Sequence, residues 1–137
     1  MDLIEIYRCF CDETRLRILH LLTQGPLCVC HLQKLLDLPQ VAASKHLAYL
    51  RERKLVDAHR HGQWMIYTLP AERSRELDLQ LQCLQDCVRT QETFRADLHR
   101  LKTLQTECKW VPQVLKLPGA HAVEQEARLH TILKATN

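Results

Sequence analysis

The feature that most constrains the fold is a pair of short amphipathic segments joined by a tight turn. Residues 29–36 carry apolar side chains at helical spacing, and Pro39 stands where a second helix begins. Proline suits that position because the missing N–H has no helical partner there. The second segment runs to about Arg53 and places Leu47 and Leu50 on one face, with polar and basic residues opposite. This pattern predicts a helix-turn-helix, a unit whose second helix can enter a DNA groove.

Helical patterning also precedes this unit, and a strand pattern follows it. Apolar spacing predicts helices over residues 2–10 and 13–23, the second with Asp12 as its N-cap. Residues 56–69 place β-branched and aromatic residues on both sides of Gly62, and glycine suits a tight hairpin turn because it adopts positive φ readily. A hairpin in this place is a wing. The sequence therefore predicts a mainly α-helical fold with a small β-hairpin, a winged helix-turn-helix.

A long helical pattern occupies residues 71–110. Its leucines form an apolar stripe, which needs cover because large apolar faces do not stay in water. We expect a second copy of the chain to cover it, so that the molecule dimerises through its first and fifth helices. The expected organisation is a winged helix-turn-helix domain over residues 1–70, a dimerisation helix over 71–110, and an extension over 111–137 that forms a weak last helix or a loose tail.

Length and composition limit the classes of function that the chain can have. A chain of 137 residues makes one domain, and its net charge of +3 permits nucleic-acid binding. No apolar run approaches the roughly 18 residues of a membrane span. The N-terminus has no signal-peptide pattern, so we expect a cytoplasmic protein without a membrane partner. Because the chain has no glycine-rich phosphate loop and no nucleophile–base arrangement in a supporting context, we do not expect an enzyme.

The cysteines favour metal or redox chemistry, because close pairs in a reducing compartment rarely form a disulfide framework. Cys28 and Cys30 stand at the start of the segment 29–36. Positions i and i+2 do not share a helix face, so both thiols can bind one ion only where the backbone is not fully helical. A helix N-terminus also favours the thiolate form, which selects soft ions. A buried pair without a ligand is the alternative.

Four segments, in this order along the chain, resemble the ArsR/SmtB family of winged-helix, homodimeric, metal-sensing repressors: FCDETRLRIL (10–19), LCVC (27–30), LPQVAASKHLAYLR (38–51) and RHGQW (60–64). The resemblance covers about residues 4–69. Within the family, the Cys-Val-Cys segment is similar to that of the arsenite-responsive branch, and cadmium and lead sensors also carry it. The chain departs from the common pattern at His31, where the arsenite branch often has aspartate, and at Gln33, where some members have a third cysteine.

The resemblance implies a repressor of arsenic resistance genes that As(III) or Sb(III) releases from operator DNA. A repressor that responds to Cd(II), Pb(II) or Zn(II), or a regulator switched by thiol oxidation, is the alternative. Trivalent arsenic prefers three sulfurs, and Cys11 or Cys9 is our first candidate for the third. Cadmium or zinc would take four ligands and could accept His31. Cys83 and Cys87, four residues apart, form a separate or cross-subunit site or pack in the dimer interface, and Cys108 stands alone.

The DNA-reading residues are expected on the second helix of the helix-turn-helix and on the wing. Gln40 can bond adenine through two hydrogen bonds, and Ser44 and Lys45 can reach base edges or phosphate. Phosphate contacts, which fix the register, are expected from His46, Tyr49 and Arg51 on the helix and from Arg60 and His61 at the wing tip. A homodimer would read a palindromic double-stranded site with half-sites ~34–36 Å apart.

Overall fold

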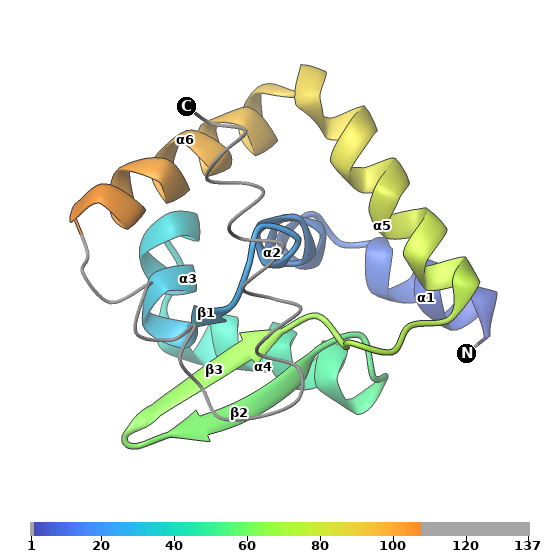
Figure 1. The fold of residues 1–137 in the computed structure, drawn as a ribbon, viewed down its shortest axis with the longest axis horizontal. Helices are drawn as coiled ribbons and strands as arrows, with labels where there is room; N and C mark the ends of the chain where they lie inside the picture. Colours follow the sequence, from blue (N-terminus) through green and yellow to red (C-terminus); the bar gives the residue numbers. More distant parts are fainter. Residues whose placement is uncertain (1, 108–137) are drawn as a thin grey trace.

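The computed structural model describes residues 2–107, without the side chains of residues 87, 88 and 105–107. Cys108 and the expected extension over 111–137 lie outside the described residues. In chain order, the elements are α1 (Leu3–Phe10), α2 (Glu13–Leu22), β1 (Leu27–Cys28), α3 (Val29–Leu36), α4 (Gln40–Glu52), β2 (Asp57–His61), β3 (Trp64–Thr68), α5 (Arg75–Cys87), the 3-10 turn η1 (Val88–Thr90) and α6 (Glu92–Glu107) (Figure 1).

Local capping explains where the first helices begin. Asp12 is the N-cap of α2, and its side chain accepts a hydrogen bond of 2.9 Å from the backbone N–H of Arg15. α3 ends at Asp37, whose φ of 52° lies in the left-handed region, and α4 follows directly after Pro39. The predicted helix-turn-helix is therefore confirmed as α3 and α4.

The wing is also confirmed, and the sheet contains one strand more than predicted. β2 and β3 pair antiparallel, with His61 opposite Trp64, and Gly62 in the turn has a φ of 60°. β1 pairs with the other side of β3, where Cys28 lies opposite Ile66, and gives the strand order β1-β3-β2. The sequence did not reveal β1, because a strand of two residues has no periodicity to detect.

The prediction of one continuous helix over residues 71–110 is wrong. The chain breaks at η1, and α6 folds back to contact α2 and α3 (Figure 1). This return buries Phe94 and Leu101 of α6 in the core, where they are 5% and 3% exposed. A straight helix would carry these side chains away from the core, so the gain in buried apolar surface accounts for the break.

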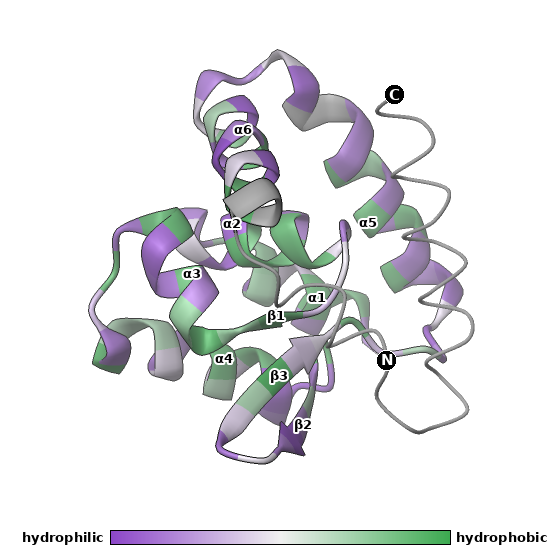
Figure 2. Cartoon of the chain, turned by 60° about the vertical axis from the view of Figure 1, so that its left-hand side comes forward, coloured by the Kyte–Doolittle hydropathy of each residue, from purple (hydrophilic) through white to green (hydrophobic). Residues whose placement is uncertain are grey.

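The apolar stripe of α5 is covered by the chain itself rather than left for a partner. Leu77, Leu81 and Leu84 belong to the same core as the leucines of α2 and α3. Figure 2 shows α5 as amphipathic, with hydrophobic and hydrophilic residues alternating along its length. Within residues 2–107, no helix has both the length and the apolar character that a membrane crossing requires.

Candidate thiol site and DNA-reading helix

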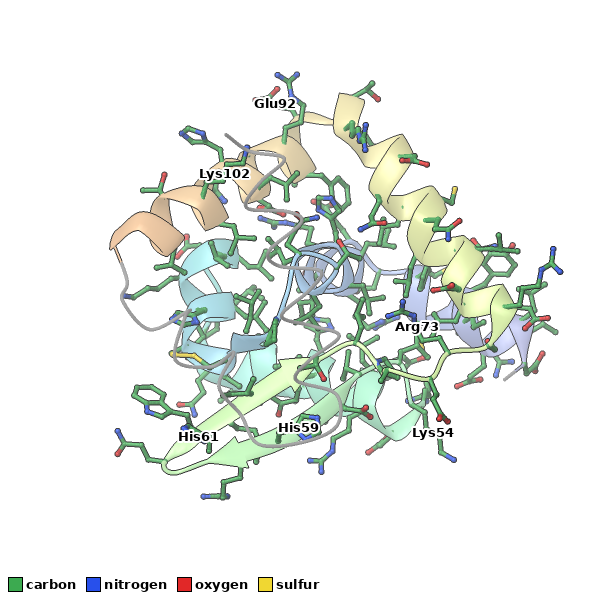
Figure 3. All side chains as sticks on the ribbon, viewed as in Figure 1. Lys54, His59, His61, Arg73, Glu92 and Lys102 are labelled. Atoms are coloured by element: carbon green, nitrogen blue, oxygen red, sulfur yellow. A yellow bond between two sulfur atoms is a disulfide. The ribbon has the colours of Figure 1, made fainter. Side chains whose placement is uncertain are left out.

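Cys28 and Cys30 lie where the sheet passes into the helix-turn-helix. Cys28 ends β1 and is the N-cap of α3 with an extended backbone, φ −88° and ψ 164°. This extended residue brings the two Cα atoms to 5.4 Å, and the sulfurs form a disulfide, drawn as a yellow bond in Figure 3. Cys28 is 2% exposed and Cys30 is half-buried. The prediction that the pair lies at the start of this helix is therefore confirmed, whereas the disulfide was not expected.

His31 joins the two cysteines. The ligand atoms of Cys28, Cys30 and His31 all lie within 4.8 Å of one another, and no other group of three or more potential ligands is found among the described residues. Burial lowers the pKa of His31, and the nearby positive charge of Lys34 lowers it further. A lowered pKa favours the neutral imidazole, which is the form that binds a metal ion. Once the disulfide is reduced, the cluster offers two thiols and one imidazole.

The other cysteines are not brought to this cluster. Cys9 is fully buried in α1, and burial raises the pKa of its thiol, which disfavours the metal-binding thiolate. Cys11 is exposed after the end of α1, and Cys83 is exposed on α5. The side chain of Cys87 is not among those described. Within the described part of this single chain, no third sulfur therefore joins Cys28 and Cys30.

The outer surface of α4 and the wing carry most of the expected DNA-reading residues. Gln40, Ser44 and Lys45 are exposed in the first two turns of α4, and Arg51 is exposed near its end. On β2, Arg60 and His61 are exposed as expected. His59, two positions before His61, is also exposed and was not among the predicted contacts (Figure 3).

His46 and Tyr49 instead interact with neighbouring parts of the same chain. The Nδ1 atom of His46 lies 3.9 Å from a carboxylate oxygen of Asp12. The Tyr49 ring lies between two guanidinium groups, with the central carbons of Arg15 and Arg53 at 4.2 and 3.5 Å from the ring centroid. These contacts join α4 to α2 and give both side chains a packing role. A sequence pattern could not reveal the contacts with Asp12 and Arg15, because these partners come from another element. Arg53, in contrast, is the C-cap of α4, four residues after Tyr49.

Known proteins with similar sequences include regulators of arsenic resistance. The chain is 38% identical over 97 residues to the arsenic resistance transcriptional regulator ArsR1 of Pseudomonas putida, a match that covers 70% of this chain and 74% of that protein. It is 40% identical over 90 residues to the arsenical resistance operon repressor of Escherichia coli, which covers 62% of this chain and 77% of the repressor.

A comparison with solved structures and a comparison with protein families agree with these sequence matches. The structure of reduced HlyU from Vibrio cholerae superposes with a TM-score of 0.57 at 32% identity, over 64% of this chain and 88% of that one. Residues 12–58, which include α2, the two cysteines and the whole helix-turn-helix, match the family described as bacterial regulatory protein, arsR family. With its winged helix-turn-helix and these relatives, the chain belongs to the arsR family of DNA-binding bacterial regulators.

Proposed function

We propose that the chain is a homodimeric transcriptional repressor that binds palindromic operator DNA and leaves it when As(III) is captured at Cys28 and Cys30. One observation carries this proposal: both thiols lie at the start of α3, the first helix of the helix-turn-helix. Family membership makes the chain a regulator rather than an enzyme, in agreement with the sequence expectation.

The position of Cys28 supports a coupling between ion and DNA. An ion held by both sulfurs would tie β1 to the start of α3, and Cys28 pairs with Ile66 of the wing in the sheet. α3 in turn packs on α4. Ion capture can thus disturb the reading helix and the wing together. The coupling free energy, typically ~1–3 kcal/mol, is reciprocal, so DNA must weaken ion binding by the same factor.

Trivalent arsenic is the inducer that the thiol pair and the named relatives favour. The disulfide is first reduced by a dithiol of the cell, taking up two electrons and two protons. Arsenous acid then forms two As–S bonds and releases two water molecules. Antimonite can follow the same course. The third position of arsenic is left to a donor outside the described cluster, for which Cys11 and Cys9 remain candidates despite their distance from it in one chain.

His31 supports a second class of inducer. Two thiolates and a neutral imidazole are three of the four ligands that Zn(II) or Cd(II) prefers, and water can supply the fourth. Pb(II) is a further soft candidate. The proposal therefore has to be tested with a panel of ions rather than with arsenite alone.

The disulfide between Cys28 and Cys30 supports a different function, a thiol redox switch. Peroxide would take two electrons and two protons from the thiol pair and give the disulfide and two water molecules. In that case oxidation alone would release the DNA, and no ion would be needed.

The reading surface and the dimer contacts complete the proposal. DNA is contacted by exposed residues of α4 and the wing, namely Gln40, Ser44, Lys45, Arg51, Arg60 and His61, with His46 and Tyr49 in a supporting role. Dimerisation uses α1 and α5, whose exposed large apolar residues are Leu3, Ile4, Tyr7 and Leu79. Burying such side chains between two copies would remove them from water.

The decisive experiment measures release of a fluorescent duplex that the reduced protein has selected from a random library. Arsenite, antimonite, cadmium, lead and zinc are titrated under a phosphine reductant, and peroxide is titrated without any ion. We expect arsenite and antimonite to release the duplex at the lowest concentrations. Release by zinc or cadmium alone would identify the second class of inducer, and release by peroxide alone would identify the redox switch.

A further inference from the structure

The outward face of α4 contains an apolar residue that the proposed DNA contacts leave unexplained. Val41, Ser44, Lys45 and Ala48 are spaced i, i+3, i+4 and i+7 and are all exposed, so they form one stripe along the helix. We call these four residues the reading stripe. Residues between them, such as Ala43 and Leu47, are buried against the core.

Val41 is the most exposed of the large hydrophobic residues identified in the described chain. It is 70% exposed, whereas Val56 is 1% exposed. A single surface valine is ordinary by itself. The position of this valine is what matters. Val41 is the second residue of α4, and the N-terminal residues of a recognition helix are those that reach base edges in the major groove.

The chemistry of the major groove indicates which DNA group an exposed valine can contact. Each base presents hydrogen-bonding atoms there, and the 5-methyl group of thymine is the apolar group that a side chain can contact. Ser44 and Ala48, the small members of the reading stripe, allow the helix to approach the bases closely. No acidic residue lies among these four positions, and Glu52, one turn further along α4, lies 3.7 Å from the positive charge of Arg53. Gln40, directly before Val41, is suited to adenine.

We propose that Val41 packs against the 5-methyl group of one thymine in each half-site and so determines specificity at that base pair. The inference rests on the proposed reading of DNA by α4. Because Val41 makes an apolar contact with one methyl group, its contribution is to the choice of base rather than to overall electrostatic attraction.

The test is a thermodynamic cycle between the protein and the DNA. The reduced full-length protein selects a duplex from a random library, and each thymine is then replaced in turn by deoxyuridine, which lacks only the methyl group. We expect wild-type affinity to fall about fourfold at one thymine per half-site, the fold-change that corresponds to burying one methyl group. Val41→Ala, which removes both γ-methyl groups, should lose most of this difference between the thymine and deoxyuridine duplexes.

Two results would overturn the assignment: no thymine at which deoxyuridine weakens wild-type binding, or a Val41→Ala protein that keeps the full sensitivity. Urea denaturation shows whether Val41→Ala remains folded, as an exposed helical alanine should. The Lys45→Ala protein distinguishes an error in the assignment of Val41 from an error in the proposed function. If α4 does not read DNA, the Lys45→Ala protein binds the selected duplex as tightly as the wild type. If α4 reads DNA without Val41, the Lys45→Ala protein loses binding, while wild-type and Val41→Ala proteins respond equally to the loss of the thymine methyl group.

Discussion

Arg17 holds the carboxylate of Asp97 through two hydrogen bonds, from Nε at 2.9 Å and from Nη2 at 2.8 Å. The two residues are separated by 80 positions and join α2 to α6. Asp97 is fully buried, and the side chain of Arg17 is 17% exposed. The hydrogen bond to Asp97 raises the pKa of Arg17, which favours the charged guanidinium. Arg100, which also reaches Asp97, donates a hydrogen bond of 3.1 Å to the backbone oxygen of Leu35 in α3.

Asp97→Asn should lower the free energy of unfolding by about 3 kcal/mol, because breaking a buried ion pair leaves Arg17 without its countercharge. Urea denaturation followed by circular dichroism measures this change. Asp86→Asn is the matched control, since Asp86 and Arg89 form an exposed pair at 3.6 Å. It should change stability by less than about 1 kcal/mol. Equal effects of the two substitutions would show that the Arg17–Asp97 pair does not hold α6 in place.

His20 should make the fold sensitive to mild acid. It is 2% exposed and packs edge-on against Phe94, with ring centroids 5.4 Å apart. Burial lowers the pKa of His20, and the charge of Asp97 opposes this only in part. On acidification, His20 therefore takes up a proton in the unfolded chain at a pH where it is still neutral in the folded chain. The free energy of unfolding falls as the pH drops through about 6.5, by up to about 1.4 kcal/mol per pH unit for this proton.

His20→Leu should flatten that dependence, as measured by urea unfolding from pH 8 to pH 5. Some dependence should persist, because burial lowers the pKa of His31 in the same direction. His99→Gln, on the exposed side of α6, is the matched substitution outside the core. A His20→Leu protein with the wild-type slope would exclude His20 as a source of acid sensitivity.

Cys28→Ser and Cys30→Ser should each bind DNA but fail to release it on arsenite. A hydroxyl has nearly the shape of a thiol but does not ionise near neutral pH and is a hard ligand. Fluorescence anisotropy of the labelled duplex under reductant measures the release. Cys83→Ser tests the separate or cross-subunit site considered above, and this protein should still release DNA if Cys28 and Cys30 form the sensor. Release of the Cys28→Ser protein at wild-type arsenite concentrations would place the sensing site elsewhere.

Gln40→Ala combined with Lys45→Ala should abolish specific DNA binding, because each good base contact contributes ~1–3 kcal/mol. Ion binding and urea stability should not change, since both side chains are exposed. Lys102→Ala removes an exposed lysine from α6 and should leave binding intact (Figure 3). An unchanged footprint of the double variant would assign DNA reading to another surface.

Ile4→Glu combined with Leu79→Glu should give monomers that bind operator DNA weakly. Both side chains are exposed in the single chain, at 60% and 50%, so the substitutions leave its core intact. Leu84 would be a poor choice for this test, because it is 7% exposed and its loss would unfold the chain. Sedimentation velocity measures the association state, with Gln63→Glu in the wing turn as the control. A double variant that remains dimeric would rule out the α1–α5 surface.

Local signals made the helix-turn-helix and the wing predictable. Pro39, Gly62 and the N-cap at Asp12 act on their own neighbours in sequence, and the structure uses each of them as expected. The return of α6 was not predictable, because it depends on contacts such as Arg17–Asp97 between distant segments. The same holds for the contact of Tyr49 with Arg15, since helical spacing places Tyr49 on α4 but cannot show a partner from α2.

The cluster was predictable in part for the same reason. Cys28 and Cys30 are close in sequence, and the N-cap geometry that lets their sulfurs meet follows from where the helix starts. The expected contribution of Cys9 depended on how α1 packs against α3, which no local pattern encodes. Its complete burial is a property of the assembled core.

The shortness of β1 has a consequence for the kinetics of the response. A strand of two residues at the edge of a sheet is held by few backbone hydrogen bonds, so it can open locally at much less free energy than the core helices. Local fluctuations of this kind would expose the sulfur of Cys28, which is otherwise shielded from solvent. How often the sulfur of Cys28 becomes accessible is then governed by how often this edge frays, while the rest of the domain stays folded.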